Sequence, residues 1–173
     1  MKKLLPIPVV AALTVMLLAA CGGSGSDTAV EPVAIAPGTA CALDGMLLAD
    51  YPGPKAQIHY AGQAEPDFFC DTVELFSIYL NPEQVRTVRG LFVQDMGQAQ
   101  WDEPRGHWID AKQAYFVHGS SRRGAMGPTL ASFAFETDAV AFAEEFGGKV
   151  MGFTDITPDM VILHGGALHD HGM

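Results

Sequence analysis

The sequence is poor in basic residues. It contains 10 lysines and arginines against 20 aspartates and glutamates, which gives a formal net charge of −10. An acidic surface repels the phosphates of nucleic acids and anionic lipid head groups. We therefore expect no nucleic-acid partner.

The sequence also lacks the short motifs of several enzyme classes. It has three cysteines but no Cys-x-x-Cys pair, which argues against a thiol-disulfide oxidoreductase. It has no Gly-x-Ser-x-Gly of a serine hydrolase and no glycine-rich phosphate loop. These absences predict that the protein is not an enzyme.

The apolar run at the N-terminus is too short for a membrane span, which needs about 20 residues. Lys2 and Lys3 precede an uncharged stretch from Leu4 to Leu18, and small residues follow it. This layout is typical of a secretory signal. We predict a signal peptide over residues 1–20, which is left out of the fold prediction.

The residues at the end of this signal, Leu18-Ala19-Ala20-Cys21, match a bacterial lipobox. In such a sequence the cysteine is acylated and becomes the mature N-terminus. We therefore predict lipidation of Cys21 and a position on the periplasmic side of a bacterial membrane, with inner or outer membrane left open. The alternative is an ordinary cleaved signal with an incidental cysteine.

Removal of residues 1–20 leaves 153 residues with 8 basic and 20 acidic side chains, a formal charge of −12. Residues 21–40 begin with a Gly/Ser-rich stretch and contain two prolines, so they are predicted to form a flexible lipidated linker. The remainder is enough for one medium domain or for two small units that share a core.

Residues 41–97 are predicted to form a ββαβ unit. The pattern indicates strands over 57–61, 67–70 and 88–95, and a helix over about 71–80. Asp71 with Glu74 three residues later predicts a capping box at the start of this helix. Asn81-Pro82 is expected to end it.

Residues 98–160 repeat this pattern. Strands are predicted over 114–118, 131–135 and 149–153, and a helix over 137–146 that Gly147-Gly148 ends. Either unit alone is too small to bury much core. The sequence therefore predicts an α+β fold of two homologous ββαβ units that pack together, followed by a His-rich tail over 161–173.

Cys41 and Met46 carry the first candidate metal site. They lie five residues apart around a turn that Asp44-Gly45 forms easily. A thiolate and a thioether select Cu(I) over harder ions. A core methionine is the plainer interpretation of Met46. Cys41 and Cys70 could also form a disulfide in an oxidising compartment.

Met126 is the second candidate, because it lies between Gly124-Ala125 and Gly127-Pro128 and so in a loop. His118, at the end of a predicted strand, is an additional candidate ligand, although a structural histidine is commoner there. The tail residues His164, His169 and His171 could collect Cu(II), zinc or nickel, or simply form a frayed end.

Several short motifs, taken in order, resemble a known family. They are Cys41-x-x-Asp44-Gly45-Met46, residues 92–95, 108–111 and 114–117, Gly119-Ser120, residues 125–127, 141–143 and 146–148. This arrangement resembles NosL, the nitrous oxide reductase accessory lipoprotein, from the lipobox to about Ile156. Two departures are Ala125, where a proline is commoner before Met-Gly, and the additional thiol of Cys70.

This resemblance implies two homologous ββαβ domains that bind Cu(I) for delivery to nitrous oxide reductase and its copper-assembly machinery. It implies that Cys41, Met46 and Met126 are the copper ligands. Asp44 is then expected to form the turn or to support the ligands without binding copper itself. The sequence thus predicts a membrane-anchored copper chaperone. The alternative is a structural or thiol-disulfide envelope lipoprotein without a metal role, for which Cys41 and Met46 would be dispensable.

Overall fold

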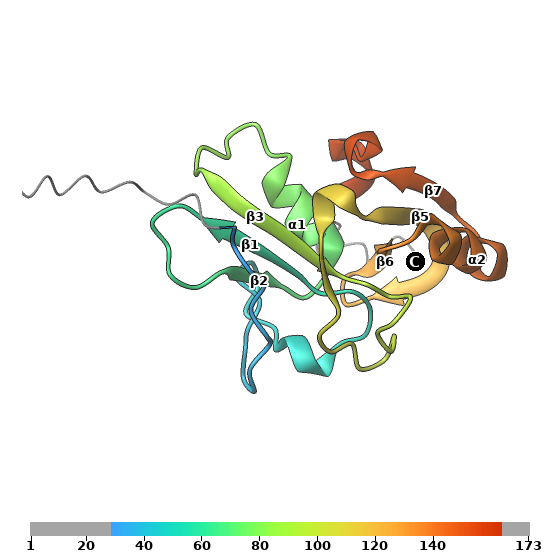
Figure 1. Cartoon of the computed structure of the whole chain (residues 1–173), viewed down its shortest axis with the longest axis horizontal. Coiled ribbons are helices and arrows are strands. Elements are labelled where there is room, and N and C mark those ends of the chain that lie inside the picture. The colour runs from blue at the N-terminus through green and yellow to red at the C-terminus, as the bar shows by residue number, and fades with distance from the viewer. Residues whose placement is uncertain (1–28, 164–173) are drawn as a thin grey trace, which may run out of the picture.

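The computed structural model describes residues 29–163. Within this range, two antiparallel sheets and two α-helices make up the fold (Figure 1). One sheet has four strands in the order β2-β1-β3-β4, and the other has three in the order β6-β5-β7. The signal peptide, Cys21 and the histidines of the tail lie outside the described residues.

The first ββαβ unit consists of β1 (Ala56–Tyr60), β2 (Asp67–Phe69), α1 (Thr72–Tyr79) and β3 (Val88–Gln94). These bounds lie within one or two residues of the prediction. The capping box is confirmed, because Asp71 accepts a hydrogen bond from the Val73 amide while Glu74 accepts one from the Asp71 amide. Sequence patterning was therefore sufficient to place this unit.

The second unit consists of β5 (Tyr115–Gly124), β6 (Gly127–Phe133), α2 (Glu136–Phe146) and β7 (Lys149–Gly152). In both units the first strand lies between the other two, and the helix connects the second strand to the third. This shared topology confirms the α+β class and agrees with the predicted pair of ββαβ units.

Strand β4 (Trp108–Asp110) extends the first sheet by pairing antiparallel with β3. Its residues belong to the stretch 98–160 that we assigned to the second unit. The chain thus completes the first sheet before it begins the second ββαβ pattern. The local sequence of this short strand does not indicate which of the two sheets it joins.

Strand β5 is twice as long as predicted, because it continues beyond His118 to Gly124. The register with β6 shifts between His118 and Arg123, and Gly119 has a φ of 81°. A β-bulge places extra residues in one strand of a pair. Beyond it, the pairing of β5 with β6 resumes at Arg123. Ala125 and Met126 form its turn, as the loop prediction required.

Helix α1 packs between the two units and so joins their cores (Figure 1). The Phe76 ring of α1 meets the Phe116 ring of β5 edge to face, with centroids 5.2 Å apart. Val117, the next residue of β5, contributes instead to the core under α2. The second sheet is therefore buried on both faces, one by each helix.

The last part of the predicted linker belongs to the folded domain. Val33 accepts a hydrogen bond from the side-chain amide of the buried Gln57 and donates one to it, at 3.0 and 2.9 Å. Ile35 packs against the core. The described part of the chain also has four 3₁₀ helices: Leu48–Asp50, Ala111–Gln113, Phe153–Asp155 and Pro158–Val161. Within residues 29–163 no helix is long and apolar enough to cross a membrane.

Candidate metal-binding site

A tight turn holds the first candidate ligands. The Cys41 amide donates to the Met46 carbonyl at 2.8 Å, and the Gly45 amide donates to the Cys41 carbonyl at 3.0 Å. Asp44 Oδ1 accepts from the Met46 amide at 2.9 Å. Gly45 has a φ of 79°, which glycine adopts without strain. The Asp44-Gly45 turn is thereby confirmed, and it brings the Cys41 and Met46 backbones together.

The turn docks on the residues that precede helix α1. The Ala42 amide donates to the Phe68 carbonyl at 2.7 Å, which places Cys41 beside Cys70 and the first turn of the helix. Cys41 and Cys70 are buried, and both thiols are free. The structure thus brings the cysteines together without a disulfide.

A cluster of four potential ligands results, made of Cys41, Asp44, Cys70 and Glu74. Their ligand atoms all lie within 4.8 Å of one another. Asp44 is exposed, whereas the other members are buried. The cluster therefore has one solvent-facing side and a buried base that contains both sulfurs.

Glu74 connects the two thiols. Its Oε2 lies 3.3 Å from Cys41 Sγ and 3.3 Å from Cys70 Sγ, and it also accepts from the Asp71 amide at 3.2 Å. Its Oε1 is buried and has no hydrogen-bond partner among the residues that the structure describes. Buried polar atoms are rarely left unpaired. The orphaned oxygen therefore marks a position where a positive charge would be favourable.

The environment makes Cys41 the more acidic thiol. Its hydrogen bond with the Cys70 side chain lowers the pKa of Cys41 from 9.0 to about 6, against the opposing effect of burial. That hydrogen bond, together with burial, holds the pKa of Cys70 well above its usual range. Burial and the nearby Cys41 charge raise the pKa of Glu74 to about 7. Cys41 is thus the group that becomes a thiolate, the form that binds metals.

Lys55 supplies a buried positive charge beside the cluster. Its side chain is 1 % exposed, and Nζ donates to the carbonyls of Tyr51, Pro52 and Cys70 at 2.7, 3.0 and 3.1 Å. Burial lowers the pKa of Lys55 to about 8, so the ammonium form still predominates at neutral pH. This ammonium partly balances the acidic groups at the start of α1.

The second unit reaches the same place through its β5–β6 hairpin. The Met126 amide donates to Asp71 Oδ2 at 3.3 Å, and Thr129 Oγ1 donates to Asp71 Oδ1 at 2.6 Å. Met46 and Met126 are both half-buried and pack against the core cluster that contains Cys41. The structure therefore brings the hairpin with Met126 to the helix that carries Glu74.

The histidine candidates are not brought to this cluster. His118 lies in β5, where it pairs with Leu130 and Lys149 of the neighbouring strands, and the four-residue cluster does not include it. His164, His169 and His171 lie outside the described residues. Their roles remain predictions.

Glu74 and Lys55 were not among the sequence-predicted site residues. The capping box identified Glu74 as a helix-start residue, but nothing in the local pattern shows that its carboxylate also contacts two thiols. Cys70 and Glu74 are four residues apart at the start of a helix, and this spacing could have indicated that their side chains lie on the same face. Lys55 carries no such signal, since a lysine is usually exposed.

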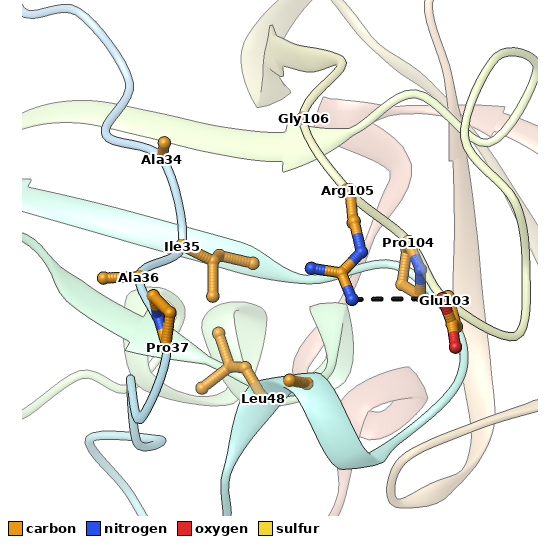
Figure 2. A pocket seen from close by; sticks show the side chains of 10 residues that line it. Ala34, Ile35, Ala36, Pro37, Leu48, Glu103, Pro104, Arg105 and Gly106 are labelled. Carbon is orange, nitrogen blue, oxygen red and sulfur yellow. Dashed lines mark ion pairs between the residues drawn. The ribbon is translucent and has the colours of Figure 1, made fainter.

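A separate cavity of about 460 Å³ lies between the N-terminal segment and the loop before β4 (Figure 2). Arg105 and Glu103 face each other at its rim, 3.9 Å apart, opposite Ile35 and Leu48. Among the residues that the structure describes, those that line it include no cysteine, methionine or histidine; they are Ala34, Ile35, Ala36, Pro37, Leu48, Ala49, Glu103, Pro104, Arg105 and Gly106. A soft metal therefore finds no ligand there.

Comparisons with known proteins identify relatives of this chain. The family model described as NosL matches residues 32–161. A copper-binding lipoprotein NosL from Stutzerimonas stutzeri is 41% identical over 170 residues, covering 92% of this chain and 87% of the relative. One from Achromobacter cycloclastes is 38% identical over 158 residues, covering 89% and 81%. The crystal structure of the copper chaperone NosL from Shewanella denitrificans superimposes with a TM-score of 0.72 at 42% identity, covering 75% of this chain and 97% of that chain.

Proposed function

Because this chain belongs to the NosL family, we propose that it is a membrane-anchored chaperone that binds Cu(I) on the periplasmic side of a bacterial membrane. It delivers the ion to nitrous oxide reductase and its copper-assembly machinery. The lipid on Cys21 holds it at the membrane. Its role is transport of an ion, so it is not an enzyme.

The observation that carries this proposal is the environment of Cys41. The thiol is buried, lies at the base of a cluster of potential ligands and has a pKa lowered to about 6. A thiolate is therefore available at neutral pH, and thiolates favour Cu(I) over harder cations. Cys41 supplies the charged ligand that neutralises the ion.

Met46 and Met126 are the thioether ligands in this proposal. Both are half-buried and pack against the core cluster that includes Cys41, one from the 41–46 turn and one from the β5–β6 hairpin. Thioethers are soft but neutral, so each holds Cu(I) weakly. A site that combines one thiolate with two such donors can bind copper firmly and still release it to a partner.

The acidic groups assist without being the main ligands. Carboxylates suit harder ions than Cu(I). Asp44, at the exposed side of the cluster, keeps the turn closed through the Met46 amide. Its charge also attracts cations to the solvent-facing side, where the ion enters and leaves.

The test is a Cu(I) titration of the reduced mature chain against a competing chelator, followed by transfer to copper-free nitrous oxide reductase. Cys41→Ser is expected to lose most of the Cu(I) affinity and all transfer. Thr137→Val, which changes an exposed residue of α2, is the control and should behave like the wild type. Unchanged affinity in Cys41→Ser would favour the structural-lipoprotein alternative or another site.

A further inference from the structure

A second thiol lies in the site that we propose for copper. Cys70 is fully buried, and its Sγ lies within 4.8 Å of Cys41 Sγ. Two metal–sulfur bonds of about 2.3 Å each, the length found for zinc thiolates, span up to about 4.6 Å. The two sulfurs are therefore spaced so that one ion can bond both.

We propose that Cys70 is a second sulfur ligand, so that Cu(I) is held between the Cys41 and Cys70 thiolates. This inference rests on the proposed copper-binding function and adds a ligand to the same site. A soft ion such as Cu(I) is well matched to two thiolates. The methionines then serve as the exchangeable donors on the solvent-facing side.

The Glu74 carboxylate supports this assignment by its geometry. Oε2 lies 3.3 Å from each sulfur and so holds the two side chains together. Oε1 is buried without a hydrogen-bond partner among the described residues, although the residue is 0 % exposed. An unpaired buried carboxylate oxygen is costly. With Cys41 as the thiolate, Cu(I) between the sulfurs replaces the Cys70 proton with an ion of the same charge, so copper binding adds no negative charge beside this carboxylate.

The local charges suit a site with two thiolates. One Cu(I) and two thiolates carry a net charge of −1, and a buried charge needs a partner. The buried Lys55 ammonium lies next to Cys70, since Nζ donates to the Cys70 carbonyl at 3.1 Å. The fold thus places a compensating cation at the side of the cluster where the second thiolate forms.

Copper binding replaces the thiol proton of Cys70 with the metal ion. The S–H bond breaks, an S–Cu bond forms, and the proton passes to bulk water. The Glu74 oxygen 3.3 Å away is an acceptor on that route. No electron moves, because copper enters and stays as Cu(I).

The experiment compares the full mature chain with its Cys70→Ser, Cys41→Ser and Thr137→Val variants, all reduced and loaded with Cu(I). Chelator competition measures affinity, and X-ray absorption at the copper edge counts bound sulfurs. Affinity alone does not decide the matter, because loss of a residue that only supports a ligand also costs about 10–100-fold. The sulfur count identifies a ligand directly.

We expect Cys70→Ser to lower Cu(I) affinity about 100-fold and to remove one sulfur from the copper shell. Thr137→Val, at an exposed position of α2, should change neither quantity. Wild-type affinity and sulfur count in Cys70→Ser, together with loss of binding in Cys41→Ser, would overturn this inference and leave the proposed function intact. A wild-type chain that binds no Cu(I) would overturn both.

A folding failure in Cys70→Ser is detected by melting curves of the metal-free proteins. Cys70→Ala then replaces it, because a buried thiol behaves as a small apolar group. X-ray absorption on the copper-loaded wild-type chain tests the assignment without any substitution. Its copper shell should contain two sulfurs at thiolate distances, and a single such sulfur would contradict the assignment.

Discussion

Thr129 Oγ1, on strand β6 of the second unit, donates a 2.6 Å hydrogen bond to Asp71 Oδ1, at the N-cap of helix α1 in the first unit. The other oxygen of the same carboxylate accepts from the Met126 amide at 3.3 Å. One buried carboxylate thus caps the helix that carries Glu74 and fixes the hairpin that carries Met126. The two units are joined at the candidate site itself.

Thr129→Val should destabilise the protein, because it keeps the side-chain shape but removes a hydrogen bond to a carboxylate. A bond of this kind contributes about 1.5–3 kcal/mol. Chemical denaturation of the metal-free chain measures the loss. The exposed Thr137→Val on α2 is the control and should change stability by less than about 0.5 kcal/mol. Equal stabilities for the two variants would show that the junction is not held by Thr129.

Met126→Leu should weaken Cu(I) binding without much loss of stability. Leucine keeps the volume and the apolar character of methionine but has no sulfur. Chelator competition and melting curves with and without copper provide the two measurements. Because a ligand that binds the native state stabilises it, the copper-induced rise in Tm should be smaller in the variant. Equal affinities and equal shifts would mean that Met126 only packs against the core.

Stability should fall as pH rises from about 4 to about 6. Burial raises the pKa of Asp71 from 3.8 to about 6, so the folded protein holds a proton that the unfolded chain has released. The resulting stabilisation is complete below pH 4 and is lost as pH rises through 6. Denaturation midpoints across this range would show the fall. Asp71→Asn, which does not titrate, should flatten this part of the profile, and an unchanged slope would assign it to another group.

The metal-free, reduced chain should develop thiolate absorbance in the ultraviolet with a midpoint near pH 6. This step belongs to Cys41, whose pKa is lowered by the Cys70 thiol. It should vanish in Cys41→Ser. In Cys70→Ala the donor is lost, so the midpoint should move to higher pH. A wild-type chain without a step between pH 5 and 8 would contradict this assignment of the acidic thiol.

Lys55→Met should cost about 2–4 kcal/mol of stability. Three carbonyls lose the ammonium that pairs with them, and each unsatisfied buried acceptor is costly. Methionine has nearly the length of lysine, so the loss reports on charge and hydrogen bonding more than on volume. Lys112→Met, at an exposed position, is the matched control. Denaturation curves measure the free energy of unfolding of both variants. An equal loss in the two variants would contradict the role given to Lys55.

Local sequence determined the secondary structure closely where periodicity and capping agree. Helix α1 begins one residue after Asp71 as the capping box requires, and β3 and β7 begin at the predicted residues. Strand β5 was predicted too short, since the segment from Gly119 to Arg123 is polar and carries a glycine with positive φ. Its extension depends on pairing with β6, and a single segment does not contain that information.

The sequence by itself determined the duplicated ββαβ pattern, the Asp44-Gly45 turn and the candidate sulfurs, because each depends on neighbours along the chain. It left open whether Cys41 and Cys70 pair, and it did not indicate that Glu74 and Lys55 surround them. Only the tertiary structure decided this, since Cys41 and Glu74 are 33 residues apart and Asp71 and Met126 are 55 apart. Long-range contacts of this kind are set by how two units bury a shared core around α1. The chemistry of the site was thus present in the residue types, and its arrangement came from packing.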